Sequence, residues 1–202
     1  MAADKVQQVI DALRLGRPVL LPTDTVYGLC VSADEHSVRG LYELKGRTEA
    51  QPTALLAASI EVLLRLVPEL HGRDEALVRA LLPGPYTLVL ANPAHRFAWL
   101  TGANPDTIGV RVPRLARAAQ QVVDAVGSVA ATSANEPGGA AGTSLEDVPG
   151  RIRALCGAEL DCGHLPGVAS TVIDFSGSRP VVIREGAASS AAAIARAAAV
   201  NA

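Results

Sequence analysis

The sequence predicts an α/β domain, and three observations lead to that class. Apolar residues recur at helical spacing in several segments, short apolar runs bounded by Gly, Pro or charge lie between those segments, and 49% of the 202 residues are hydrophobic. A chain of this length and composition can bury one packed core. We therefore expect a single domain over residues 1–202, with an Ala-rich helix or tail over 187–202.

The first third of the chain predicts two helices with a buried strand between them. Apolar spacing predicts a helix over residues 4–15 that stops at Gly16, and the apolar run 18–21 predicts a strand. That strand ends in a Thr-rich loop, and α/β sheets commonly bind ligands at such an edge. A second helix follows, with Ser37 as its N-cap and Gly46 as its end.

The rest of the chain continues this alternation. Residues 92–106 lack periodicity and predict a long surface loop able to cover a site, and the Pro- and Gly-rich segment 136–143 predicts a flexible loop. Ser144 with Asp147 resembles a capping box that opens a helix toward Leu155. The further expected helices are 60–66, 74–82 with Asp74 as cap, 114–126 and the tail; the further expected strands are 53–58, 86–90 after a turn at 83–85, 108–112, 128–131, and a hairpin of 168–175 with 179–183.

Composition argues against several classes of protein. The formal net charge of −2 disfavours nucleic-acid binding through bulk positive charge, and 3% aromatic residues leave few stacking platforms for single strands. No apolar run approaches the roughly 18 residues of a membrane span, and no signal pattern precedes the first helix, so we expect a cytoplasmic protein. Three cysteines fit free thiols, and the spacing of Cys156, Cys162 and His164 matches no standard zinc site, so no metal is expected on them.

Common catalytic motifs are missing from the sequence. It contains no Walker A pattern, no Gly-x-Gly-x-x-Gly after a strand and no Gly-x-Ser-x-Gly elbow, so any bound nucleotide must be held by side chains. The four histidines, His36, His71, His95 and His164, have no evident acid or nucleophile partner in sequence. We therefore expect chemistry that depends on placed charge more than on a catalytic histidine.

Four cations are the best candidates for chemistry. Lys45 and Arg47 follow the predicted second helix and are spaced to meet one polyphosphate, although they also suit the negative end of the helix dipole. Arg111 and Arg184 lie on or beside apolar strands, where an arginine is costly unless it faces a cleft or an anion; a structural ion pair is the alternative for each. Together with the Thr-rich loop, these cations suit an anionic ligand with a polar organic head.

Ser133 and Asn135 form a second candidate pair. They stand two residues apart where a predicted strand becomes a loop, and alternate residues of an extended segment face the same way. A hydroxyl and an amide would then point into one site. Ordinary turn chemistry is the alternative, because Ser, Asn, Pro and Gly all favour turns.

An ordered set of motifs resembles the YrdC-like family of threonylcarbamoyladenylate synthases, over nearly the whole chain. The set runs Pro22-Thr23-Asp24-Thr25-Val26-Tyr27-Gly28-Leu29, Lys45-Gly46-Arg47, Pro83-Gly84-Pro85-Tyr86-Thr87-Leu88, Val110-Arg111-Val112-Pro113, Ser133-Ala134-Asn135 and Ala169-Ser170-Thr171-Val172-Ile173-Asp174. The resemblance implies a twisted mixed sheet flanked by helices, with a basic concave cavity. It also implies the single-domain form of the family, without the extra C-terminal domain of longer relatives.

The resemblance further implies a nucleotidyltransferase. Such enzymes make threonylcarbamoyladenylate and pyrophosphate from L-threonine, bicarbonate and ATP with Mg²⁺, and the product is handed to a tRNA threonylcarbamoyl-transferase complex that modifies adenosine 37. Weak binding of tRNA itself is a further expectation. Residue by residue, the resemblance places Thr23 or Thr25, Arg111, Ala131 and Ser170 near threonine, and Lys45, Arg47, Gln51, Thr107, Ser133, Asn135, Ala141 and Arg184 near ATP, with Lys45 and Arg47 as the catalytic pair.

One departure and two alternatives accompany this resemblance. The family often continues after Lys-Gly-Arg with Asn-Pro-Leu and then a histidine, whereas this chain has Gln51 and, where a donor is expected, Leu56. The loop 136–143 is the expected lid. The first alternative is a non-catalytic module of the same fold that binds double-stranded RNA or tRNA; the second is the carbamoyl-transfer module of hydrogenase maturation, which normally sits in a much longer chain.

Overall fold

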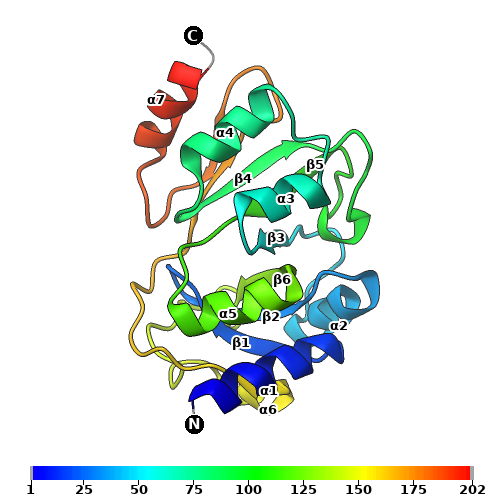
Figure 1. The fold of residues 1–202 in the computed structure, drawn as a ribbon, viewed down its shortest axis with the longest axis vertical. Coiled ribbons are helices and arrows are strands. Elements are labelled where there is room, and N and C mark those ends of the chain that lie inside the picture. Colours follow the sequence, from blue (N-terminus) through cyan, green and yellow to red (C-terminus); the bar gives the residue numbers. More distant parts are fainter. Residues whose placement is uncertain (1, 201–202) are drawn as a thin grey trace.

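A nine-stranded mixed sheet forms the centre of the computed structural model, which describes residues 2–200 (Figure 1). The strand order is β7-β1-β2-β6-β3-β5-β4-β8-β9, and the pairs β1–β7, β3–β5 and β4–β8 are parallel. The strands are β1 (Val19–Pro22), β2 (Tyr27–Ser32), β3 (Ala54–Ala57), β4 (Tyr86–Ala91), β5 (Thr107–Arg111), β6 (Ser128–Ser133), β7 (Ala158–Glu159), β8 (Thr171–Asp174) and β9 (Val181–Arg184). The predicted α/β class with a mixed sheet is confirmed.

Helices cover the sheet and extend along its length (Figure 1). They are α1 (Ala2–Arg14), α2 (Glu35–Lys45), α3 (Ile60–Leu66), α4 (Arg73–Leu81), the 3₁₀ turn η1 (Ala98–Leu100), α5 (Arg117–Val126), α6 (Gly150–Leu155) and α7 (Ser190–Val200). Helix α7 packs beside α4 at one end of the molecule, and α1 lies at the other (Figure 1). No helix within residues 2–200 has the length and apolar character that crossing a membrane requires.

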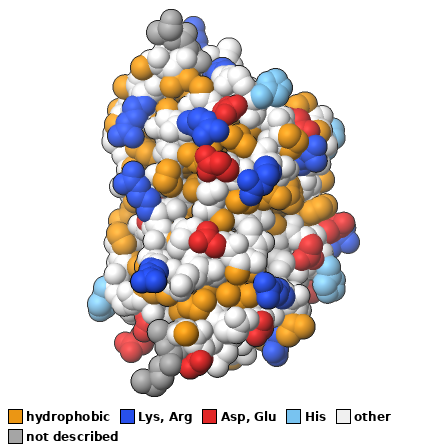
Figure 2. All heavy atoms as spheres, viewed as in Figure 1, with side chains coloured by type: hydrophobic (Ala, Val, Ile, Leu, Met, Phe, Trp, Pro, Cys, Tyr) orange, Lys and Arg blue, Asp and Glu red, His pale blue; other side chains and the backbone are white. Residues whose placement is uncertain are grey.

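The alternation of side chains along each strand divides the core into two clusters. Leu20 and Leu55 point into the larger cluster, which they share with apolar residues of α2, α3 and α4. Their neighbours Leu21 and Leu56 point into the smaller cluster, which α1 and α5 cover. The outer surface seen in Figure 2 mixes basic and acidic side chains, in keeping with the net charge of −2.

Strand β2 is an element that the sequence pattern does not predict. Tyr27 and Gly28 belong to the expected Thr-rich loop, but the structure pairs them antiparallel with β1, Pro22 opposite Tyr27. The turn between the two strands is held by Thr23, whose hydroxyl accepts from the backbone N–H of Val26 at 3.2 Å and donates to the Val26 carbonyl at 2.7 Å. The Thr-rich motif is therefore a tight hairpin that carries β1 directly into β2.

Three predicted helix starts are wrong. Asp34, not Ser37, caps α2, because the Asp34 carboxylate accepts from the backbone N–H of Ser37 at 2.9 Å. Gly72, not Asp74, stands at the N-cap of α4.

The third wrong start is the expected capping box. The Asp147 N–H does donate to the Ser144 hydroxyl, at 3.3 Å, yet no helix begins there. Pro149 disfavours helical geometry at Val148, so α6 starts only at Gly150.

The second helix ends as predicted. Gly46 has a positive φ of 58°, and its N–H bonds back to the last turn of α2, so the chain reverses there. Lys45 and Arg47 consequently stand on either side of the reversal. The long segment 92–106 is also a loop, although Leu100 within it is fully buried and anchors it to the larger core cluster.

Candidate functional site

A cavity of about 500 Å³ opens on one face of the sheet. Its floor comes from adjacent strands that carry small side chains: Gly28 on β2, Ala131 on β6, Ala54 on β3 and Gly109 on β5. Ala131 stands directly opposite Ala54 in the strand register, and a Cβ added to Gly109 would lie 3.9 Å from the Ala54 Cα atom. The sheet is hollow here because these residues do not fill the space above it.

Most of the predicted site residues line this cavity: Thr23, Arg47, Thr107, Arg111, Ala131, Ser133, Ser170 and Arg184. Four others contact that lining by hydrogen bonds, namely Thr25, Lys45, Gln51 and Asn135. Segments from Thr23 to Arg184 thus meet at one place, as the sequence predicts. The ligand assigned to each residue stays a prediction.

Ala141 is the predicted residue that, among the described residues, neither lines the cavity nor forms a hydrogen bond with a lining residue. It belongs to the loop 136–143, which is tied down at both ends. The Asn135 amide donates to the Gly139 carbonyl, Glu136 pairs with Arg151, and the Thr143 hydroxyl donates to Asp147 at 3.1 Å. In this position the loop does not cover the cavity, and its role as a lid stays a prediction.

Lys45 is the most buried of the four cations, with 4% of its surface exposed. Its ammonium donates to the backbone carbonyls of Ser133, at 2.9 Å, and Asn135. Burial lowers the pKa of Lys45 below its ordinary value, and the nearby charge of Arg47 lowers it further. Within residues 2–200 no carboxylate forms a salt bridge with Lys45.

Arg47 is held by neutral oxygen atoms. Its guanidinium donates to Thr132 Oγ1 at 3.1 Å, to Gln51 Oε1 at 3.1 Å and to the Pro52 carbonyl at 3.0 Å, and it lies 5.9 Å from the ring centre of Tyr42. These contacts fix the direction of the guanidinium without neutralising it. Arg47 lines the cavity and Lys45 bonds to the lining residue Ser133, and neither forms a salt bridge among residues 2–200, although the charge of Glu136 acts on Lys45 from a greater distance. We call this pair of cations the phosphate end of the cavity.

Arg111 stands at the end of β5 and is compensated. Its Nη2 atom contacts the carboxylate of Asp24 and donates to Thr25 Oγ1 at 2.8 Å. The Thr25 Oγ1 atom in turn lies 3.0 Å from Thr23 Oγ1. The alternative of a structural ion pair holds for Arg111, which both pairs with Asp24 and lines the cavity. We call this group the Arg111 end.

The Nε atom of Arg111 is buried and has no hydrogen-bond partner among the described residues. Arg111 is only 8% exposed, and burial lowers its pKa, an effect that the Asp24 charge opposes. A buried donor without a partner costs stability unless a ligand or water takes its hydrogen bond. Leu56, where the sequence departs from the family pattern, pairs in register with Arg111 and offers it no polar contact.

Arg184 reaches the cavity from the edge strand β9. Its guanidinium donates twice to the Ser170 carbonyl, at 3.0 and 2.9 Å, and the Ser170 hydroxyl lies 2.8 Å from Thr87 Oγ1. Burial lowers the pKa of Arg184, and the charge of Arg111 lowers it further. Arg184 is in no salt bridge between residues 2 and 200, so it adds a further uncompensated cation.

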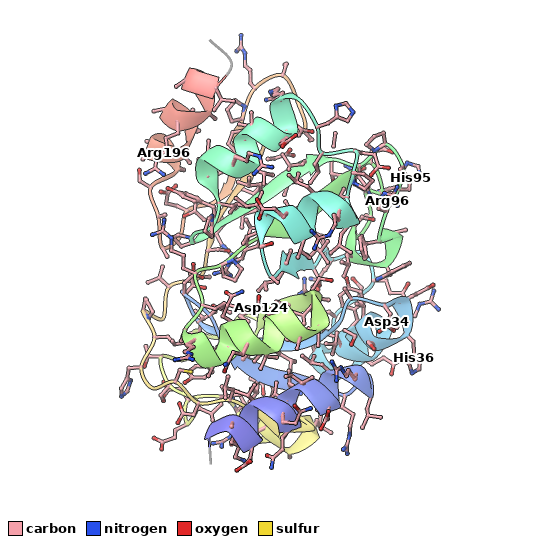
Figure 3. The ribbon with its side chains drawn as sticks, viewed as in Figure 1. Asp34, His36, His95, Arg96, Asp124 and Arg196 are labelled. Carbon is pink, nitrogen blue, oxygen red and sulfur yellow. The ribbon has the colours of Figure 1, made fainter. Side chains whose placement is uncertain are left out.

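Several lining residues were not predicted. Thr101, Ala103 and Asn104 enter from the long loop 92–106, and Asp174 enters from β8. Asp24 and Asp174 both lie inside motifs that carry the family resemblance, which was the available signal for them. The four histidines are exposed and lie outside the lining, and Figure 3 shows His36 and His95 at the periphery.

The cavity combines cations with hydroxyl groups and apolar floor atoms, so it suits an anion joined to a small polar molecule. Among the described residues no group of three or more His, Cys, Asp or Glu side chains is arranged to hold a metal ion. Mg²⁺ commonly binds through substrate phosphates and keeps several waters.

Comparisons with known proteins agree on one family. The model of the family Sua5/YciO/YrdC, described as "Telomere recombination", matches residues 11–186. A Halorhodospira halophila protein named threonylcarbamoyl-AMP synthase is 32% identical over 186 residues, which cover 90% of each chain. A Pyrococcus abyssi protein of that name is 36% identical over 188 residues, and this chain spans only 54% of its length. The crystal structure of P. abyssi Sua5 complexed with L-threonine superimposes with a TM-score of 0.81 at 34% identity, over 90% of this chain and 54% of that one.

Proposed function

The chain belongs to the Sua5/YciO/YrdC family, and on that premise we propose that it is an L-threonylcarbamoyladenylate synthase. As a nucleotidyltransferase it would convert L-threonine, bicarbonate and ATP into threonylcarbamoyl-AMP and pyrophosphate. The product would pass to a tRNA threonylcarbamoyl-transferase complex for modification of adenosine 37 in the cytoplasm. The relatives' names and the threonine complex of P. abyssi Sua5 support this proposal.

One structural observation carries the proposal. Two cations of the cavity lining, Arg47 and Arg184, and the adjacent Lys45 form no salt bridge with a carboxylate among the described residues, while Arg111 forms one. An ATP triphosphate carries close to four negative charges and needs such uncompensated cations. The cavity therefore has one end suited to a polyphosphate and another, beside Thr23 and Thr25, suited to an amino acid.

The chemistry of the proposed reaction needs these groups in fixed places. The threonine amine attacks the carbon of CO₂ formed from bicarbonate and loses a proton, which yields an N-carboxylate. An oxygen of that carboxylate attacks the α-phosphorus of ATP, and the bond to the bridging oxygen of pyrophosphate breaks. Lys45, Arg47 and Arg184 would stabilise the charge that develops on the α-phosphate and the leaving group.

Binding and orientation account for the remaining residues. Arg111, the Thr23 and Thr25 hydroxyls, Ser170 and the backbone of Ala131 would hold threonine with its amine directed at the reacting carbon. Mg²⁺ bound to the phosphates would supply further charge neutralisation. Arg47, Arg111 and Arg184 line the cavity without a ligand, and Lys45 lies beside it. These side chains would therefore need to move little during the reaction.

Pyrophosphate release tests the proposal directly. Purified protein with ATP, Mg²⁺ and bicarbonate should release pyrophosphate with L-threonine, more slowly with L-serine, and not at all without an amino acid. If a folded protein that binds ATP releases none with threonine, the proposal is wrong. Salt-sensitive retention of double-stranded RNA or tRNA by that protein would then favour the non-catalytic module.

A further inference from the structure

Asp24 distinguishes the Arg111 end of the cavity from the phosphate end. It sits at the tip of the β1–β2 hairpin, and its side chain is only 12% exposed. One carboxylate oxygen contacts Arg111 Nη2, and the other accepts from the backbone N–H of Arg114 at 3.1 Å. Asp24 therefore ties the hairpin to the end of β5 and brings a negative charge against a buried guanidinium.

This contact changes what Arg111 offers to a ligand. The ion pair is close to neutral as a unit, so it attracts free anions less than a lone guanidinium would. Arg111 nevertheless keeps a donor for a ligand, since its side chain lines the cavity and its Nη1 atom makes no hydrogen bond within residues 2–200. Asp24 itself is not among the lining residues, so its negative charge acts on a ligand through Arg111 and the hydroxyl groups beside it.

A neutral pair of donor and acceptor suits a zwitterion. An α-amino acid carries a carboxylate that needs donors and an ammonium that needs acceptors, at a net charge of zero. The hydroxyls of Thr23 and Thr25 lie in the same hydrogen-bonded group and can serve either part. A phosphate presents only negative charge and acceptors, so it gains little from Asp24 and is repelled by it.

We propose that Asp24 is the residue that makes the Arg111 end select a zwitterionic amino acid over a phosphate. This inference rests on the proposed function, because it takes ATP and threonine as the two ligands that the cavity must keep apart. Without Asp24, Arg111 would become a second cation without a salt bridge beside Arg184, and the phosphate-binding part of the cavity would extend over the Arg111 end. ATP or pyrophosphate would then compete with threonine there.

The test measures the two ligands separately, without turnover. Isothermal titration calorimetry gives the Kd of L-threonine and of inorganic pyrophosphate for the wild-type protein and for Asp24→Asn, which keeps the size of the side chain and removes its charge. We expect Asp24→Asn to bind threonine at least about tenfold more weakly and pyrophosphate at least about threefold more tightly. Opposite shifts of this kind would not follow from a general loosening of the hairpin, which weakens both ligands.

Two further variants serve as controls. Asp124→Asn makes the same change of charge on the outer surface of α5, where Figure 3 labels Asp124, and it should shift neither Kd by more than about twofold. Asp24→Ser gives a second removal of the charge with a residue that suits a turn. It should reproduce the opposite shifts of Asp24→Asn.

Each remaining outcome has a defined meaning. The proposal is overturned if, in Asp24→Asn and Asp24→Ser, the Kd values of threonine and pyrophosphate stay unchanged or move in the same direction. It is also overturned if both variants fail to fold, because Asp24 would then serve only the fold. A wild-type protein that binds pyrophosphate but no threonine contradicts the proposed function itself. If threonine does bind but its selection over pyrophosphate does not depend on Asp24, only the proposal about Asp24 fails.

Discussion

Lys45 and Arg111 are both almost fully buried cations, Arg111 in the cavity lining and Lys45 beside it, yet only Arg111 forms a salt bridge among the described residues. Arg111 is 8% exposed and pairs with Asp24, whereas Lys45 is 4% exposed and donates only to backbone carbonyls. A buried ion pair is mainly a structural unit that must stay complete. A buried cation without a salt-bridge partner costs free energy that a bound anion would recover. We therefore expect changes at Arg111 to affect stability as well as ligand binding, and changes at Lys45 to affect mainly ligand binding.

The largest expected effect is on stability, at the compensated cation. Arg111→Met should lower the free energy of unfolding by about 3 kcal/mol or more, because it leaves the nearly buried Asp24 carboxylate without its partner. Lys45→Met should cost about 1 kcal/mol or less, because it removes a desolvated charge and strands no carboxylate. Urea denaturation followed by circular dichroism measures both values.

The double variant Arg111→Met with Asp24→Asn is the matched control for this result. Removing both charges should recover part of the loss, which a double-mutant cycle would show as coupling between the two sites. Equal destabilisation by Arg111→Met and Lys45→Met would contradict the distinction between the two cations.

The next largest effect is on catalysis, at the uncompensated cations. Lys45→Ala and Arg47→Ala should each reduce threonine-dependent pyrophosphate release by about 10²-fold or more, because each removes a preorganised positive charge from the site of the α-phosphate. Lys5→Ala is the control, since Lys5 is the other lysine of the chain and is exposed on α1. Near-wild-type turnover in both cavity variants would refute the assignment of this end to phosphate.

A smaller effect, on the affinity for ATP, should follow when Arg47 is given a carboxylate partner as Arg111 has. Gln51→Glu places a carboxylate where Arg47 Nε now donates to a neutral amide at 3.1 Å. Since Gln51 is exposed, the new ion pair is screened, and we expect the Kd of ATP to rise by about fivefold and that of threonine to stay within about twofold. Gln8→Glu on the exposed side of α1 repeats the change away from the cavity, and an equal loss there would mean that only net charge matters.

Local patterns were sufficient for much of the fold and for the phosphate end. The end of α2 at Gly46 is predictable because a glycine follows an amphipathic run. The reversal of the chain at Gly46 then places Lys45 at the end of the helix and Arg47 just after it. Ser133 and Asn135 are expected to point into one site, or else to serve a turn. Ser133 lines the cavity, whereas Asn135 does not and instead accepts from the Ser133 hydroxyl at 2.6 Å. These inferences hold because the residues involved are close in sequence.

The parts that were not predictable depend on contacts between distant segments. β2 pairs with β1 through the local hairpin and with the distant β6, for example Gly28 with Ser133, and no periodicity in the Thr-rich motif indicates the second partner. Asp24 and Arg111 are 87 residues apart, so the sequence left an ion pair of Arg111 open without naming the acid. Asp24 becomes the partner of Arg111 only because the fold brings the β1–β2 hairpin to the end of β5.

The smallest expected effect is a dependence of stability on pH that comes from Lys45 and not from Arg111. Burial lowers the pKa of Lys45 below its ordinary 10.5, whereas a guanidinium stays charged throughout this range. As pH rises through the lowered pKa, the folded protein releases the Lys45 proton while the unfolded chain still holds it. The unfolded state then binds more protons, so the free energy of unfolding should rise with pH up to about 10.5 relative to Lys45→Met.

Binding of ATP should change in the opposite direction over the same window. Loss of the ammonium charge removes attraction for the triphosphate, so the Kd of ATP should increase by a few-fold between the lowered pKa and 10.5. Lys45→Arg, which cannot lose its charge there, should show a flat profile. Two other buried groups titrate above this window, since burial raises the pKa of both Tyr27 and Cys30 to about 12. An ATP affinity that fell equally in wild type and Lys45→Arg would mean that Lys45 is not the titrating cation at the phosphate end.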